Sequence, residues 1–191
     1  MKIFGYTEEE QDIHFGIRPN YKHRLSNLLK RQLQEMLDSG RDVDAVTKEI
    51  NYLEGLINET KTKKEAQFNK GKLRGFWHKH YFLGTIKQIA VNTSNHIQAS
   101  DNFQKINEEA LISSNSLNDY ANNLAKNILK STLKVKKENS SLTGDWIIYI
   151  PYDNLNYYLM LSEHSLRGEN TDHLYDKLIT ECQEQFPFIF S

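Results

Sequence analysis

Apolar residues recur at helical spacing through the first third of the chain. A first series places its apolar side chains on one helical face, at Leu25, Leu29, Leu33 and Met36. Ser39-Gly40 then predicts a helix end, because glycine adopts the left-handed conformation that often closes a helix. A second series advances in steps of three and four, at Val43, Val46, Ile50, Leu53 and Ile57, which is the spacing of a packing seam between helices. Since few residues separate the two series, we expect an antiparallel helical hairpin over about residues 20–67.

The pattern changes after this region. Residues 75–84 form the densest aromatic stretch, Gly-Phe-Trp-His-Lys-His-Tyr-Phe-Leu-Gly, and the pattern leaves open whether it is a strand or a helix start. Helices are then expected at about 86–97 and at 116–135. Residues 146–150 and 157–161 are rich in residues that suit strands and predict a β-hairpin with a longer loop, in which Pro151 ends the first strand. Thr171 begins a final helix that is expected to end near Pro187.

These elements predict an α+β protein. The N-terminal antiparallel helical hairpin, residues 1–70, precedes a mixed body, residues 71–191, which contains the β-hairpin and the terminal helix. A chain of 191 residues can also hold both parts in one continuous domain. Since an isolated hairpin is marginally stable in water, its strands are expected to pack against helices or to pair with a further strand.

Composition narrows the class of protein. The single cysteine, Cys182, excludes an intramolecular disulfide and a cysteine-rich zinc site. The N-terminus lacks the basic start and apolar run of a signal peptide. The longest apolar run, residues 146–150, is too short to span a membrane. We therefore expect a cytoplasmic protein that has no contact with membranes.

Two histidines are the strongest candidates for chemistry. His78 and His80 are two residues apart, so an extended backbone would direct both imidazoles to one face. They could act as acid and base on a phosphodiester, with Arg74 or Lys79 stabilising the phosphate charge. A metal site would require further ligands, for which His96, His164, Glu163 or Asp145 are available. The competing interpretation is a packed aromatic junction in which both imidazole rings are structural. In either case, no metal or cofactor is predicted.

Basic residues surround these histidines. Seven lie within twenty residues, accompanied by Glu65 alone: Lys61, Lys63, Lys64, Lys70, Lys72, Arg74 and Lys79. Cations neutralise phosphates and aromatic rings stack on bases. The residues predicted to bind RNA or DNA are therefore Lys63, Lys64, Lys70, Lys72, Lys79 and Trp77. The alternative is a solvated basic face that balances acidic segments elsewhere in the chain.

Two segments of the sequence resemble segments of other proteins. Residues 73–82, Leu-Arg-Gly-Phe-Trp-His-Lys-His-Tyr-Phe, and residues 143–149, Thr-Gly-Asp-Trp-Ile-Ile-Tyr, resemble segments of short bacterial proteins without an assigned activity. This resemblance implies a bacterial origin, among mobile or accessory genes. The basic and aromatic composition and the small hairpin also resemble those of compact bacterial toxin ribonucleases.

Two functions are consistent with these patterns. The first is a nucleic-acid-directed bacterial accessory protein. More specifically, it would be a small metal-independent ribonuclease that uses His78, His80 and Arg74. The second is a non-enzymatic interaction module. In that case, the helical hairpin presents the seam of Val46, Ile50 and Leu53 to a protein partner or to a second copy of the chain.

Overall fold

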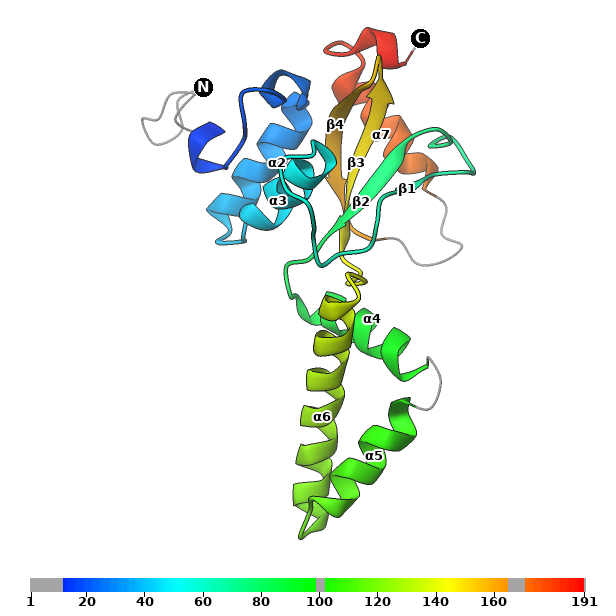
Figure 1. Ribbon diagram of the computed structural model, residues 1–191. Coiled ribbons are helices and arrows are strands. Elements are labelled where there is room, and N and C mark those ends of the chain that lie inside the picture. Colours follow the sequence, from blue (N-terminus) through cyan, green and yellow to red (C-terminus); the bar gives the residue numbers. More distant parts are fainter. Residues whose placement is uncertain (1–11, 99–101, 165–170, 191) are drawn as a thin grey trace. The chain divides into compact units, whose positions relative to one another are not determined.

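The computed structural model describes residues 12–98, 102–164 and 171–190. Its helices and strands follow one another in an order that mixes the two types (Figure 1). In chain order they are η1 (Lys22–Arg24), α2 (Asn27–Asp38), α3 (Asp44–Leu53), β1 (Ala66–Gln67), β2 (Trp77–Tyr81), α4 (Ile86–Ile97), α5 (Asn102–Ile112), α6 (Leu117–Glu138), β3 (Asp145–Tyr152), β4 (Leu155–Ser162), α7 (Asp172–Cys182) and η2 (Pro187–Ile189). The predicted α+β class is confirmed.

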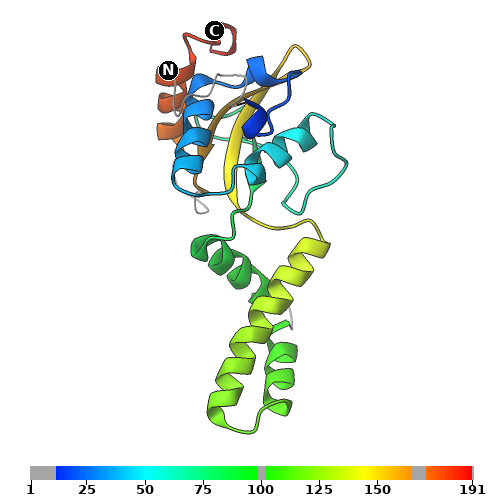
Figure 2. The same cartoon turned by 90° about the vertical axis from the view of Figure 1, so that its left-hand side faces the viewer.

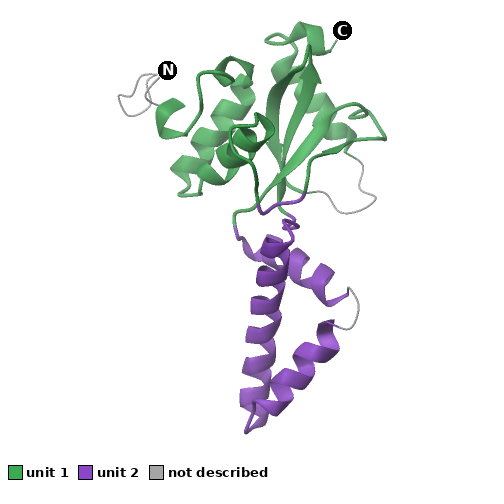
Figure 3. Cartoon of the chain, in the orientation of Figure 1, with its two compact units in different colours: residues 1–60, 64–83, 144–191 green, residues 61–63, 84–143 purple. Residues whose placement is uncertain are grey.

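The chain divides into two compact units (Figure 3). Unit 1 comprises residues 1–60, 64–83 and 144–191, and unit 2 comprises residues 61–63 and 84–143. This division differs from the predicted boundary after residue 70. Unit 2 is instead an insertion in the connection between β2 and β3, so unit 1 is assembled from segments far apart in the sequence.

Unit 1 is built on a four-stranded antiparallel sheet with the order β1-β2-β3-β4. Helices α2 and α3 cover one face, and α7 covers the other (Figure 1). We call these the α2–α3 face and the α7 face. Both are packed, which explains why the aromatic segment gave an ambiguous pattern: β2 is a strand whose side chains are at least half-buried on both sides, without a polar face.

Strand β3 shows how the sequence fills both cores. Ile147 and Tyr149 point to the α2–α3 face, where they join the cluster formed by the helices. Trp146 and Ile148 point to the α7 face and pack with Leu174 of α7. This alternation follows from the period of two residues in a strand. It also fixes the register, because a shift by one residue would exchange the two faces.

The connection between β3 and β4 is shorter than predicted. Asp153 and Asn154 make a two-residue turn with φ of 50° and 59°, the backbone that matches the twist of a hairpin. Pro151 lies inside β3, opposite Asn156, and not at its end. It is tolerated there because pairing with β2 stops at Tyr149, so no strand on that side requires an N–H donor.

Helices α2 and α3 lie within the region predicted as a helical hairpin, but α3 ends at Leu53, so Ile57 and the rest of the predicted span to residue 67 lie outside it. Ser26 caps α2 by accepting a hydrogen bond from Leu29 N, and Gly40, with φ of 69°, follows its end. However, the side chains of Val46 and Ile50 are fully buried in the same cluster as the sheet residues Ile147 and Tyr149. The predicted seam therefore packs into the core of unit 1, and it is not a surface available to a partner.

Unit 2 consists of α4, α5 and α6, and Figure 2 shows α5 lying alongside α6. Ser116 begins α6 as predicted, by accepting a hydrogen bond from Asp119 N. Helix α5 was not predicted, and α7 ends at Cys182, before the expected Pro187. No helix among the described residues is long and apolar enough to cross a membrane.

Candidate functional site

The two candidate histidines share one face of β2, as the spacing predicted. Their ring centroids are 5.5 Å apart in an edge-on arrangement. Both contact Trp146 of β3, at centroid distances of 4.8 Å for His78 and 6.5 Å for His80. This pair therefore lies on the α7 face, in the region of the sheet where β2 and β3 are paired.

A third histidine completes the group. His164 follows the end of β4, and its ring stacks on that of His80 at 5.3 Å and contacts Trp146 at 4.9 Å. Its backbone N–H donates to Asp145 Oδ1 over 3.1 Å, which holds the chain beside β3. Phe68, just after β1, contacts His78 at 4.7 Å. We call these five rings, Phe68, His78, His80, Trp146 and His164, the histidine–tryptophan cluster.

The members of this cluster differ in access to solvent. His78 and His164 are half-buried, whereas the exposed fractions of His80 and Trp146 are 5% and 7%. His78 and His164 could therefore meet a substrate at the surface. His80 lies behind them and is suited to positioning the other rings.

The backbone of Gly144 holds the ring of His80. Nδ1 of His80 lies 2.8 Å from the Gly144 carbonyl oxygen, the shorter of its two contacts with this residue. A carbonyl can only accept, so this contact favours a proton on Nδ1. Glycine is required here, because a Cβ at position 144 would lie 1.8 Å from the carbonyl oxygen of Tyr81.

One polar atom of the cluster is not satisfied. The indole N–H of Trp146 is buried and has no hydrogen-bond partner among the described residues. A buried donor without a partner costs about 1–3 kcal/mol. Such a group is uncommon in a purely structural core, and it could donate to a ligand oxygen that reaches the cluster.

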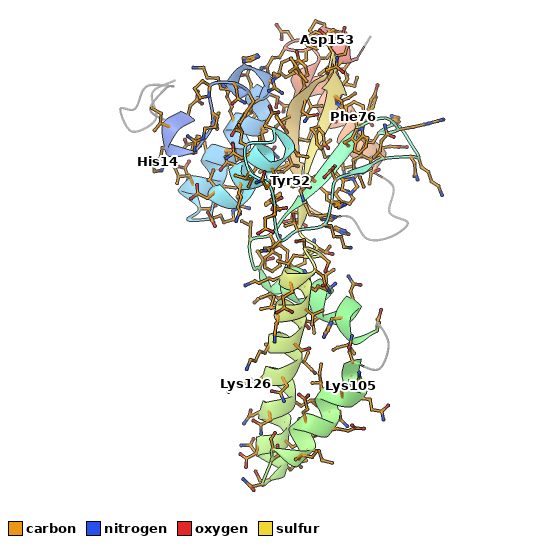
Figure 4. All side chains as sticks on the ribbon, viewed as in Figure 1. His14, Tyr52, Phe76, Lys105, Lys126 and Asp153 are labelled. Atoms are coloured by element: carbon orange, nitrogen blue, oxygen red, sulfur yellow. The ribbon has the colours of Figure 1, made fainter. Side chains whose placement is uncertain are left out.

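Lys79 does not belong to this site. It points to the α2–α3 face, where its Nζ lies 3.2 Å from Glu49 Oε2 and 3.2 Å from Thr60 Oγ1. The same ammonium lies 4.9 Å from the ring centroid of Tyr52, which is labelled on α3 in Figure 4. Burial lowers the pKa of Lys79, while Glu49 acts in the opposite direction. With 1% of its surface exposed, Lys79 is not available to a phosphate, and its predicted role was wrong.

Trp77 is also on the other side of the sheet. Its ring lies 6.4 Å from that of Tyr149 and packs against the core of the α2–α3 face. The spacing itself predicts this outcome, because odd-numbered and even-numbered residues of β2 face opposite ways. The tryptophan of the histidine–tryptophan cluster is instead Trp146, which pairs with His80 in the ladder between β2 and β3. Sequence reasoning missed that pairing and considered His164 only as a metal ligand.

The remaining predicted cations are exposed at the edge of the sheet. Lys64 precedes β1, and Lys70, Lys72 and Arg74 occupy the connection from β1 to β2, from which basic side chains project outward (Figure 4). Lys72 is partly engaged, since its Nζ lies 2.7 Å from Asp176 Oδ1. Lys63 is exposed but belongs to unit 2.

Arg74 is distant along β2 from His80. It lies in the turn before β2, and the strand carries His80 about 10 Å beyond Trp77. Arg74 can therefore bind a distant phosphate along the same edge, but it is not placed beside His80.

A metal centre is not formed by the residues that sequence analysis considered. Among residues 12–98, 102–164 and 171–190, no three His, Cys, Asp or Glu side chains are arranged to hold a metal ion. The imidazoles of the cluster are groups that can accept and donate protons near neutral pH. No family model, no curated protein and no solved structure matches the chain.

Proposed function

We propose that the chain binds RNA along the β1 edge of unit 1 and cleaves it by proton transfer at the histidine–tryptophan cluster. The observation that carries the proposal is the convergence of His78, His80 and His164 on Trp146, on one face of the sheet. Three imidazoles from two separated segments exceed what a packed aromatic junction requires. Exposed cations before β1 and in the connection from β1 to β2 supply the attraction to phosphate.

The proposed reaction uses the ribose 2′-hydroxyl as nucleophile. A neutral imidazole, His78 or His164, removes the 2′-hydroxyl proton, and the oxygen attacks the adjacent phosphorus. The bond from phosphorus to the 5′-oxygen breaks, and the second imidazole, in its protonated form, donates its proton to that oxygen. The products are a 2′,3′-cyclic phosphate and a 5′-hydroxyl, and the two histidines have exchanged protonation states. The step requires no metal.

His80 has a positioning role in this scheme. Its ring contacts both His78 and His164, and the Gly144 carbonyl fixes its orientation. Trp146 lies against all three rings, and its indole N–H can donate to a phosphate oxygen.

The test is cleavage of a single-stranded RNA by the full chain in the presence of EDTA. His78→Ala and His164→Ala are each expected to lower the rate by about 10²–10⁴-fold, the usual contribution of a general acid or base. His23→Ala is the matched control, because His23 is exposed on η1 of the same unit, and it should leave the rate unchanged. A DNA of the same sequence should not be cleaved, because it lacks the nucleophile.

The rate is further expected to show a bell-shaped dependence between about pH 5 and pH 8, the range in which histidine changes charge. Full activity in the His78→Ala and His164→Ala double variant, or equal cleavage of DNA, would remove the proposed mechanism.

The binding edge has a separate test. Replacing Lys64, Lys70 and Arg74 with Gln should weaken RNA binding and lower the slope of log affinity against log salt by up to about 2, because each phosphate neutralised on a single strand contributes about 0.7. Arg41, Lys48 and Lys177, which are also exposed, provide a control with the same change in charge. Equal losses in the two triple variants would show that binding depends on net charge and not on this edge.

A further inference from the structure

Positive charge is concentrated in unit 2. The whole chain has a formal net charge of −1 at pH 7. Unit 2 contains nine lysines against five acidic residues, whereas unit 1 contains fifteen basic residues against twenty acidic ones. A unit with an excess of negative charge repels a polyanion over most of its surface. The binding of RNA therefore depends on local rows of cations, and the β1 edge is one such row.

A second row of cations follows one side of α6. At 3.6 residues per turn, an arc of about 80° along this helix contains Asp119 in the first turn, then Asn123, and after that only lysines. Each of these lysines is exposed, and they are Lys126, Lys130, Lys134 and Lys137. We call these four residues the α6 lysine row. Lys126 is labelled on α6 in Figure 4.

The row faces away from the packed side of α6. Thr132, which is fully buried, lies about 160° around the helix from the middle of the row. Ser131 Oγ lies 3.0 Å from Nε2 of His96 on α4. The hydroxyl of Tyr120 donates to the Asn107 side chain on α5. In unit 2, α4 and α5 therefore contact α6 outside the row and leave its lysines uncovered.

The charges of the row repel one another. None of the four ammonium groups forms an ion pair with a carboxylate of residues 12–98, 102–164 or 171–190. Successive lysines are three or four residues apart, and like charges at this spacing destabilise a helix. The helix dipole favours a cation only in the last turn, which accounts for Lys137 but not for Lys126 and Lys130. A face that only solubilised the helix could alternate lysine with glutamate, whereas this uninterrupted row is relieved by a bound polyanion.

We propose that the α6 lysine row binds the phosphate backbone of single-stranded RNA, as a second contact besides the β1 edge. The choice of RNA as the polyanion rests on the proposed function. Successive lysines rise about 4.5–6 Å along the helix axis, which is comparable with the distance between adjacent phosphates of a strand, so the row meets about three to four phosphates. Contacts to phosphate carry no information about the bases, so this contact is independent of the RNA sequence.

Other polyanions fit the row less well. An anionic membrane takes up an apolar side of a helix together with its charges, and the arc contains no apolar residue from Asp119 to Lys137. A stable protein interface has an apolar core, which four adjacent lysines do not supply. A nucleic-acid strand requires neither, because its affinity for such a row comes from the neutralisation of phosphates.

The probe is a fluorescent 2′-O-methyl RNA of about 20 nucleotides, which lacks the nucleophile and is not cleaved. Its binding to the full chain is measured by anisotropy over a range of salt concentrations. The row variant Lys126→Gln, Lys130→Gln should bind at least about tenfold more weakly at low salt. The slope of log affinity against log salt should fall by about 1.4, because each phosphate neutralised on a single strand contributes about 0.7.

The matched control is Lys87→Gln, Lys105→Gln. These two lysines are exposed on α4 and α5 of the same unit, and the change in charge is the same, so binding should weaken by less than about threefold. Both double variants should keep the helical circular dichroism of the unchanged chain, because glutamine favours a helix about as well as lysine does. Loss of helix in the row variant alone would show that the lysines are structural and would overturn the proposal.

Cleavage of unmodified RNA separates this inference from the proposed function. The row variant should raise KM and leave kcat unchanged, because the row is not part of the histidine–tryptophan cluster. Equal losses of binding in the two double variants, or no loss in either, would overturn the role of the row and leave cleavage by unit 1 standing. Cleavage that survives His78→Ala and His164→Ala would remove the proposed mechanism and leave a row-dependent affinity standing.

Two further ligands test the choice of polyanion. Polyglutamate and phosphatidylserine vesicles should each bind more weakly than the RNA, and their binding should depend less on Lys126 and Lys130. Binding of either ligand that equals that of the RNA and is lost in the row variant would assign the row to an acidic protein or to a membrane, and would overturn the proposal. Failure of the unchanged chain to bind the RNA at about 0.1 mM would also overturn it.

Discussion

Lys79 is a positive charge buried in the core of unit 1. Its ammonium is shared among Glu49, Thr60 and the ring of Tyr52 beneath α3. Removing one member of a buried ion pair leaves an uncompensated charge, which usually costs about 3–5 kcal/mol. Lys79→Met is therefore expected to lower the free energy of unfolding by about this amount, measured by urea denaturation.

The matched control for Lys79 is the double variant Lys79→Met, Glu49→Leu. Replacing both charges with apolar groups of similar size is often close to neutral, so this variant should recover most of the lost stability. A single variant that costs less than about 1 kcal/mol would show that Lys79 reaches solvent in the native state.

Cys182 should be unreactive in the folded protein. Its side chain is fully buried, and burial raises the pKa of the thiol to about 11. The raised pKa lowers the thiolate fraction at pH 8 by about a hundredfold relative to an ordinary cysteine, and the thiolate is the reacting species. Modification by a disulfide reagent at pH 8 is thus expected to be at least a hundredfold slower in buffer than in concentrated urea. An engineered exposed thiol, Leu117→Cys, should react rapidly in both, and a native Cys182 that matches it would contradict the burial.

Individual elements depend on single backbone positions. Asn154 is held at φ of 59° in the turn between β3 and β4, a conformation that costs a β-branched residue about 1–2 kcal/mol. Asn154→Val is expected to lower the free energy of unfolding by this amount in urea denaturation. Asn154→Gly should keep or slightly raise it, because glycine adopts this conformation without strain. Equal stabilities of the two variants would show that the turn is not formed in solution.

The sequence predicted elements best where one face is polar. Helix α2 has a polar face opposite Leu29 and Leu33, so the helical period is visible in its sequence. Strand β2 has no polar face, since Lys79 and His80 are buried on opposite sides, and its period could not be read. Helix α5 was missed because Leu111 and Ile112 are exposed, which obscures its apolar face.

The candidate site could be predicted only in part, because its residues come from strands that are far apart in the sequence. The even spacing of His78 and His80 was enough to place both on one face. Their neighbours Trp146 and His164 are brought in by pairing across β3 and β4, which no local pattern in the sequence encodes.

At the scale of the whole molecule, β2 and β3 are neighbours in one sheet although unit 2 separates them in the sequence. Tyr81 and Asp145 are paired neighbours in the sheet, and unit 2 is inserted between them. Replacing residues 84–143 with Asn-Gly should therefore leave unit 1 folded, because the five-residue connection that results between Tyr81 and Asp145 has a usual hairpin-loop length.

The shortened chain is expected to show a single cooperative unfolding transition in urea, monitored by circular dichroism. It should keep RNA cleavage, since the proposed site lies entirely in unit 1. A chain without cooperative unfolding would show that unit 1 depends on unit 2 for its stability.

The insertion between β2 and β3 also sets an order of events on the ribosome. At 5–20 residues per second, roughly 3–12 s pass between the synthesis of β2 and that of β3. During this interval, the nascent chain contains α2, α3, β1 and β2 but lacks β3 and β4, which cover the apolar side chains of the helices. Unit 1 can close only after translation of β4, so the newly made protein is most exposed to chaperones and proteases while its helical insertion is being synthesised.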